Sequence, residues 1–148
     1  MIYRIIDASD RHLGDLERLE QACFSLPWTR EQLLAEFPDE QHEFLVAEDR
    51  EGKAIAYVGM MHVLDEGYIS NVAVSPSCRR QGIADALIAQ ILQRAGRLAL
   101  AFVTLEVRQS NLAAIRLYDK HGFLPVGRRK NYYERPREDA VLMTKFLK

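Results

Sequence analysis

The stretch Tyr68-Ile69-Ser70-Asn71-Val72-Ala73-Val74, followed after Pro76 by Arg79-Arg80-Gln81-Gly82-Ile83-Ala84, sets the organisation of this chain. The first run has the apolar and β-branched composition of a strand, and the second opens a helix. That helix is amphipathic, because apolar residues recur every three or four positions: Ile83, Leu87, Ile88, Ile91, Leu92 and Ala95. Another strand follows at residues 102–107. This order of strand, helix and strand predicts a right-handed crossover between two parallel strands.

The rest of the chain predicts elements that pack around this crossover. Composition and turn signals favour further strands over residues 1–6, 44–48, 54–63, 123–128 and 141–146. Helices are expected over residues 10–23, 30–37 and 111–121. In the first of these, the apolar residues are spaced three apart: Leu13, Leu16, Leu19 and Ala22. The candidate caps and stops are Thr29, Ser110 or Asn111, Pro38 and Gly122.

We therefore expect one α+β domain over residues 1–148. Its sheet should be twisted, mixed and mostly antiparallel, with about seven strands, a central parallel pair and about four flanking helices. A chain of 148 residues that is 48% hydrophobic can bury a core of its own.

The balanced charge of the chain limits the kinds of partner that it is expected to bind. The 20 basic and 21 acidic residues give a net charge of -1, so we expect no global attraction to nucleic acid or to an anionic membrane. No apolar stretch reaches the roughly 20 residues that a membrane-spanning helix needs. Cys23 and Cys78 lie far apart without a signal-like N-terminus, which indicates reduced thiols and a cytoplasmic protein. The histidines lack metal-ligand spacing, so no metal site is expected: His12, His42, His62 and His121.

The loop that begins at Arg79 is a candidate anion site. A helix N-terminus offers unpaired N–H groups and the positive end of the helix dipole. Gly82 removes a side chain where backbone must approach a ligand, and the arginines can donate to phosphate oxygens. The alternative is that Gly82 only eases the entry to the helix and that the arginines are solvated.

Glu106 is a candidate general base. It lies mid-strand, in phase with Thr104 and out of phase with the apolar residues on either side. Burying a carboxylate at a sheet centre is costly, and it raises the pKa of such a group toward the range useful for a base. The alternative is a strand-end glutamate paired with Arg108 or Lys120.

Tyr118 is a candidate general acid on the helix that follows. Asn111, Ile115 and Tyr118 share one face of this helix by their spacing. A phenol with an ordinary pKa near 10 is protonated at neutral pH and can deliver a proton to a leaving group. The alternatives are a core tyrosine and, for Asn111, a helix cap that does not exclude contact with a ligand.

Two aromatic segments are candidates for a binding groove. Pro27-Trp28 holds the single tryptophan, which could wall a groove or staple a helix to the core. Near the other end, Tyr132-Tyr133 follow the basic run 128–130. Basic residues with aromatics can bind nucleic acid, but one such segment in a chain of charge -1 is weak support for that function.

Together these residues resemble the GNAT superfamily of acetyl-CoA-dependent N-acetyltransferases. The resemblance covers residues 26–146 and rests on three motifs: Asn71-Val72-Ala73-Val74, Arg79-x-x-Gly82-x-Ala84, and Leu105-Glu106-Val107-Arg108-x-Ser110-Asn111-x-Ala113-Ala114-Ile115-x-Leu117-Tyr118-x-x-x-Gly122-Phe123. Many members have glycine where this chain has Ala84. The segments Leu26-Pro27-Trp28 and 129–140 are similar to those of members that acetylate the N-terminal alanine of ribosomal proteins.

The resemblance implies acetyl-CoA as co-substrate. The pyrophosphate would be held by the loop residues Arg79, Arg80, Gln81, Gly82, Ile83, Ala84 and Asp85. The strand residues Val72, Ala73 and Val74 would splay from the strand of Glu106 and bind the pantetheine arm, with an N–H near Val72 polarising the thioester carbonyl. Asn111 would also contact the coenzyme.

The resemblance also implies the chemistry and the acceptor. Glu106 would act as base through a water and Tyr118 as acid, while Pro27, Trp28, Tyr132 and Tyr133 would line the acceptor groove. The expected reaction acetylates a protein N-terminal α-amine, with alanine of a small-subunit ribosomal protein as the leading acceptor. The alternatives are acetylation of lysine side chains or a small-molecule amine, and a non-catalytic acyl-CoA sensor.

Overall fold

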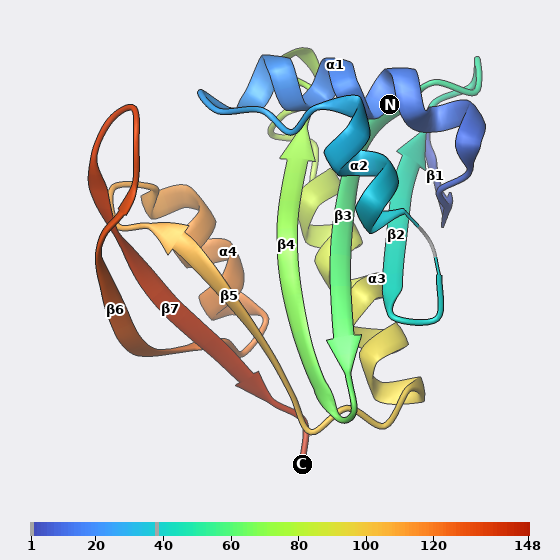
Figure 1. The fold of residues 1–148 in the computed structure, drawn as a ribbon. Helices are drawn as coiled ribbons and strands as arrows, with labels where there is room; N and C mark the ends of the chain where they lie inside the picture. Colours follow the sequence, from blue (N-terminus) through green and yellow to red (C-terminus); the bar gives the residue numbers. More distant parts are fainter. Residues whose placement is uncertain (1, 38) are drawn as a thin grey trace.

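The computed structural model describes residues 2–37 and 39–148 (Figure 1). In chain order the elements are β1 (Arg4–Asp7), η1 (Asp10–His12), α1 (Leu13–Cys23), α2 (Arg30–Glu36), β2 (His42–Glu48), β3 (Ala54–Val63), β4 (Glu66–Val74), η2 (Pro76–Cys78), α3 (Ile83–Arg97), β5 (Phe102–Arg108), α4 (Leu112–Lys120), β6 (Leu124–Tyr133) and β7 (Glu138–Phe146). The seven strands form one sheet in the order β1-β2-β3-β4-β5-β7-β6. All neighbours are antiparallel except β4 and β5. The mostly antiparallel sheet with one central parallel pair and the four α-helices are thereby confirmed.

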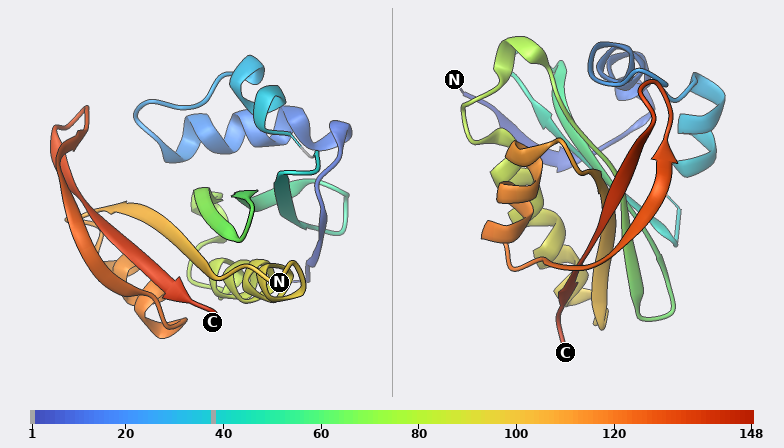
Figure 2. Two further views of the ribbon diagram at one scale, coloured as in Figure 1. Left: turned by 60° about the horizontal axis from the view of Figure 1, so that its bottom comes forward. Right: turned by 90° about the vertical axis from the view of Figure 1, so that its left-hand side faces the viewer.

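Helices cover both faces of this sheet and create two cores. On one face, α3 packs its apolar stripe, including Ile83, Leu87 and Ile91, and α4 adds Tyr118. On the other face, α1 and α2 bury a second cluster that includes Leu16 and Leu33 (Figure 2). Both faces of the middle strands are therefore buried, as the near-continuous burial of residues along β2 and β3 shows.

The central parallel pair separates after only three residue pairs. Glu66 pairs with Phe102, Gly67 with Val103 and Tyr68 with Thr104, and beyond these the two strands diverge. Figure 1 shows β4 and β5 as the two arms of a V that opens toward α1. The splay implied by the family resemblance is present, and it divides β1–β4 from the arm made of β5, β6 and β7.

The helix expected over residues 10–23 is present as η1 and α1. Within it Ala22 is exposed, whereas Glu20 is buried, because a spacing of three drifts by about 60° per step on an α-helix, so the fourth residue of such a series has left the buried face. The last two strands are longer than expected, because β6 runs to Tyr133 and β7 begins at Glu138. The helix stop predicted at Pro38 lies outside the described residues.

Candidate active site

Glu106 lies on the floor of the V between β4 and β5. Its side chain is 6% exposed, and Tyr68 donates its hydroxyl to Glu106 Oε1 at 2.5 Å. The predicted alternative partners are engaged elsewhere, since Arg108 pairs with Glu138 at 3.1 Å and Lys120 pairs with Asp85 at 2.9 Å. Glu106 is therefore held by a hydroxyl from the neighbouring strand at the point where the strands part.

A bulge in β6 brings two more groups to this carboxylate. Arg129 pairs with Ala140, but Tyr133 pairs with Glu138, so four steps along β6 match two along β7. Inside the bulge, the Tyr132 hydroxyl lies 3.4 Å from Glu106 Oε1. The Arg129 Nε lies 3.5 Å from Glu106 Oε2. The bulge thus aims one of the predicted groove residues, Tyr132, at the predicted base.

Tyr118 has a buried ring and a hydroxyl without a partner. Its side chain is 8% exposed and packs against Phe123 with ring centroids 5.7 Å apart. Burial raises the pKa of Tyr118 to about 12. No hydrogen bond to its hydroxyl is found among residues 2–37 and 39–148, and that atom is not sealed from solvent. A protonated phenol in this state is free to donate to a ligand.

The open edge of β4 presents backbone groups to the V. Ser75 N–H donates to Ile55 O at 2.9 Å, and Tyr57 is the register partner of Ala73. Because hydrogen bonds alternate along an antiparallel strand, Ala73 faces β3, while Val72 and Val74 turn their N–H and C=O groups to the open edge. The Val74 carbonyl already accepts from Arg79 Nε at 3.2 Å and from the Cys23 thiol at 3.3 Å.

The loop before α3 leaves backbone donors without partners, as an anion site requires. Gly82 has φ +77°, and a Cβ built there would meet nothing within 4 Å, so the space in front of it is open. In the described part of the chain, the N–H groups of residues 80–85 have no hydrogen-bond partner. Several unpaired donors therefore converge at the helix N-terminus, where an anion binds favourably. These observations fit the pyrophosphate of a coenzyme.

Three other predicted coenzyme residues have protein partners. Asp85 joins Lys120 and His121, and the Lys120 ammonium holds the pKa of Asp85 below its ordinary value. Its side chain thus ties α3 to α4, which leaves its N–H for a ligand. Asn111 accepts from Ala114 N at 3.1 Å, so it caps α4 as predicted and keeps its amide N–H₂ exposed. Arg79 turns back to the Val74 carbonyl.

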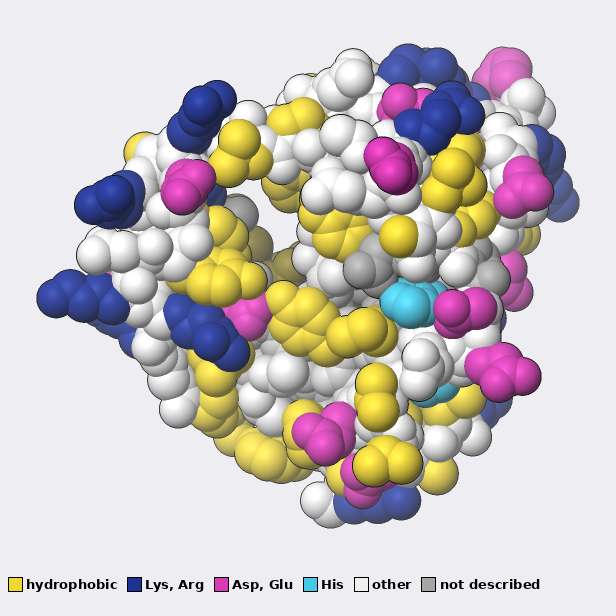
Figure 3. Space-filling view, in the orientation of Figure 1, with side chains coloured by type: hydrophobic (Ala, Val, Ile, Leu, Met, Phe, Trp, Pro, Cys, Tyr) yellow, Lys and Arg dark blue, Asp and Glu magenta, His cyan; other side chains and the backbone are white. Residues whose placement is uncertain are grey.

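The predicted acceptor residues border the other side of the V. The indole of Trp28 packs in part on the core under α1, so the staple interpretation holds for its ring. Pro27 and Trp28 lie in the loop between α1 and α2, opposite the β6–β7 hairpin that carries Tyr132 and Tyr133 (Figure 2). Figure 3 shows a hollow between these two parts, with hydrophobic side chains on its walls.

Sequence reasoning missed Tyr68 and a polar cluster around Glu20. Tyr68 could have been found by phase, because a parallel neighbour of Thr104 shares the face of Glu106. Glu20 accepts from Trp28 N at 2.7 Å, from Asn71 Nδ2 at 2.9 Å and from the Tyr57 hydroxyl. Only its phase with Leu13 and Leu16, seven and four residues earlier on the helix, signals that it is buried.

Both cysteines are free thiols. Cys78 is buried, while Cys23 is partly exposed with its sulfur 3.6 Å from Arg79 Nη2. In the described residues no group of three or more His, Cys, Asp or Glu could hold a metal ion. None of the helices described is long and apolar enough to cross a membrane.

Comparison with known proteins gives consistent relatives. Residues 13–123 match the Acetyltransferase (GNAT) family. The [ribosomal protein bS18]-alanine N-acetyltransferase of Escherichia coli is 35% identical over 127 residues, which cover 84% of each chain. The enzyme of that name from Haemophilus ducreyi is 35% identical over 141 residues, covering 93% of this chain and 96% of that protein.

The fold gives the same assignment. The crystal structure of the ribosomal-protein-S18-alanine N-acetyltransferase from Escherichia coli superposes with a TM-score of 0.92 at 31% identity, covering 99% of this chain and 94% of that one. The family match spans most of the chain and includes β4, the loop before α3, β5 and α4. This chain therefore belongs to the GNAT family of acetyltransferases.

Proposed function

We propose that this chain transfers the acetyl group of acetyl-CoA to the N-terminal α-amine of a protein, with the N-terminal alanine of a small-subunit ribosomal protein as acceptor. The observation that carries the proposal is the parting of β4 and β5 after Tyr68, with Glu106 on its floor and unpaired N–H groups at residues 80–85. The names of the relatives from Escherichia coli and Haemophilus ducreyi support the choice of acceptor.

The coenzyme would lie on the α3 and α4 side of the V. Its pyrophosphate fits the free N–H groups at Arg80, Gln81, Gly82, Ile83, Ala84 and Asp85, with Arg79 at the edge and Asn111 across from them. The pantetheine arm fits the open edge of β4, where the Val72 N–H and C=O and the Val74 N–H face away from β3, while Ala73 pairs with Tyr57 on the β3 side of the strand. The coenzyme supplies an acetyl group activated as a thioester.

Glu106 is suited to receive the proton of the acceptor amine through a water. Its carboxylate accepts from Tyr68 and lies near the Tyr132 hydroxyl and the Arg129 guanidinium, so its position is fixed. The Val72 N–H would donate to the thioester oxygen as negative charge develops there. The Tyr118 phenol, which stays protonated at neutral pH, would give its proton to the departing thiolate.

An α-amine makes a lesser demand on this base than a lysine side chain. With a pKa near 7.7 to 8.0, roughly a tenth of an α-amine is neutral at pH 7, against about four parts in ten thousand of a lysine. Pro27 and Trp28 on one side and Tyr132 and Tyr133 on the other would line the groove that receives the chain terminus.

A peptide panel tests the proposal. Peptides that begin with alanine, serine, methionine or proline, each with and without an internal lysine, are incubated with acetyl-CoA and analysed by mass spectrometry. We expect one acetyl group on the α-amine of the alanine peptides, with or without the lysine. Acetylation of lysine alone would replace the proposal with a side-chain acetyltransferase. Tight acetyl-CoA binding without any acetylation would replace it with a sensor.

A further inference from the structure

Glu20 is a buried carboxylate near the V that the chemistry above does not use. It is 1% exposed, and within residues 2–37 and 39–148 no Lys, Arg or His forms an ion pair with it. Burying an uncompensated carboxylate costs stability. Burial accordingly raises the pKa of Glu20, although three donors act in the opposite direction. A buried carboxylate that lowers stability and has no ion-pair partner calls for a role other than stabilising the fold.

The partners of Glu20 come from the two elements that would hold the two substrates. Oε1 accepts from the backbone N–H of Trp28, at 2.7 Å, in the loop between α1 and α2. Oε2 accepts from Asn71 Nδ2, at 2.9 Å, on β4. Asn71 directly precedes Val72, whose N–H faces the open edge. One carboxylate therefore links the acceptor loop to the strand that borders the thioester.

Tyr57 holds the Glu20 carboxylate in place. Its ring is fully buried, its hydroxyl donates to Glu20 Oε2, and Asn71 Nδ2 lies 3.0 Å from the same hydroxyl oxygen. Burial and the neighbouring Glu20 charge raise the pKa of Tyr57 above its ordinary value, so the hydroxyl remains a donor. The carboxylate thus has a single orientation, with Oε1 left for the loop.

We propose that Glu20 is a positioning residue, which sets the Pro27-Trp28 loop against β4 and thereby holds the acceptor terminus in line with the thioester. It does not touch either substrate. The proposal rests on the acceptor groove of the proposed function, but the position of the loop can be measured without any acetylation.

The variants are chosen to separate geometry, charge and stability. Glu20→Gln keeps an oxygen for Trp28 N–H and removes the charge, because the Asn71 amide can turn to present its own oxygen. Glu20→Ala removes the link. Leu16→Val is the matched control, since Leu16 is buried on the same helix and core and makes no contact with the loop through a polar atom. All three are first checked for cooperative thermal unfolding.

Steady-state kinetics give the first readout. For Glu20→Ala we expect KM for an alanine-terminated peptide to rise about tenfold or more, with KM for acetyl-CoA within twofold of wild type. Glu20→Gln is expected to restore the peptide KM to within about threefold, and Leu16→Val to change neither KM. If Glu20→Ala changes only the melting temperature, as Leu16→Val does, the residue is structural. If Glu20→Gln is as impaired as Glu20→Ala, the charge matters and the positioning role is wrong.

Fluorescence gives a readout that needs no acceptor. Trp28 is the only tryptophan of the chain, so its emission and its quenching by acrylamide report the loop directly. We expect a red shift and stronger quenching in Glu20→Ala but not in Leu16→Val. An unchanged Trp28 signal in Glu20→Ala would overturn the proposal, whatever the acceptor. A changed signal in an enzyme that acetylates no peptide would instead leave the loop link standing and remove the proposed function.

Discussion

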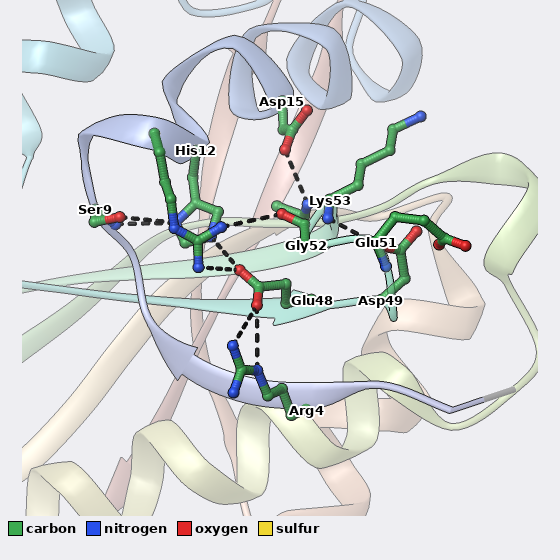
Figure 4. A network of polar contacts seen from close by, with 11 residues as sticks. Arg4, Ser9, His12, Asp15, Glu48, Asp49, Glu51, Gly52 and Lys53 are labelled. Atoms are coloured by element: carbon green, nitrogen blue, oxygen red, sulfur yellow. Dashed lines mark hydrogen bonds and ion pairs between the residues drawn. The ribbon is translucent and has the colours of Figure 1, made fainter.

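Glu48 and Glu20 are both buried carboxylates on the α1 side of the sheet, and they are held in opposite ways. Glu48, at the end of β2, meets two guanidinium groups and an imidazole: Arg4 Nη2 at 2.8 Å, Arg11 Nη2 at 2.5 Å and His12 Nε2 at 2.7 Å (Figure 4). Glu20, near the V, meets only an amide, a hydroxyl and a backbone N–H. The carboxylate at the sheet edge is paired with arginines, whereas Glu20 has no ion-pair partner among residues 2–37 and 39–148.

The histidine at the sheet edge contributes a hydrogen bond and no charge. Ser9 N–H donates to His12 Nδ1 at 3.0 Å, so that nitrogen carries no proton and Nε2 must donate to Glu48. The hydrogen bonds from His12 and Arg4 hold the pKa of Glu48 at about 2. This fold can therefore surround a buried carboxylate with charged and hydrogen-bonding partners, and it does so at Glu48, away from the V.

Glu106→Gln has the largest expected effect, because Glu106 is the proposed base. We expect kcat for an alanine-terminated peptide to fall by about 10² to 10³. Affinity for acetyl-CoA, measured by calorimetry, should stay within a factor of about two, since the coenzyme lies against β4 and the loop before α3. Equal turnover of the variant and the wild type would remove Glu106 from the mechanism.

Tyr118→Phe removes the hydroxyl of the proposed general acid. We expect kcat to fall by about 10² at the low end of the range for acid catalysis, because a thiolate leaving group with a thiol pKa near 8.5 needs only modest help. The Tyr118 hydroxyl has no protein partner, so the free energy of unfolding should change by less than about 0.5 kcal/mol. A variant that unfolds would show that the tyrosine serves the core.

Glu48→Gln tests the carboxylate at the sheet edge. The variant keeps the shape of the side chain but loses the charge that strengthens its hydrogen bonds. A hydrogen bond to a charged group contributes about 1.5 to 3 kcal/mol to the free energy of unfolding. Urea unfolding should show a loss of that size, while kcat/KM for the peptide stays unchanged at a temperature where the variant is folded. A fall in kcat/KM without loss of stability would show that this edge communicates with the V.

The sequence was sufficient for the crossover and for the place of Glu106 in the middle of β5, because both depend on local alternation and on motifs that lie close together along the chain. The strand over 102–107, its parallel partner and the helix from Gly82 follow from such patterns, and all are present. Glu20 is different. Its burial depends on Tyr57 and Asn71, which are distant in sequence, and a lone glutamate on a helix is ordinarily solvated.

The β6 strand shows the other limit of sequence reasoning. Almost all of its residues are exposed, so it carries no apolar alternation, and the basic run 128–130 looks like the end of a strand. The strand continues only because β7 supplies partners up to Tyr133. The bulge that aims Tyr132 at Glu106 is therefore set by tertiary pairing and has no local signal.

The smallest expected effect is a difference between Glu48 and Glu20 in how their contributions to stability change with pH. The two contributions should change in opposite directions. The folded-state pKa of Glu48 is depressed, so its contribution to stability is present above the unfolded pKa near 4.5 and is lost as pH falls toward 2. The folded-state pKa of Glu20 is raised. Glu20 therefore contributes most to stability below its unfolded-state pKa, and that contribution is lost as pH rises toward its folded-state pKa.

The unfolding free energy of wild type minus that of Glu48→Gln should thus rise with pH between 2 and 4.5. The same difference for Glu20→Gln should fall as pH rises above about 4.5. Urea titrations at several pH values measure both slopes, each by about 1 kcal/mol or less per pH unit, and two slopes of equal sign would mean that Glu20 has a compensating cation in solution.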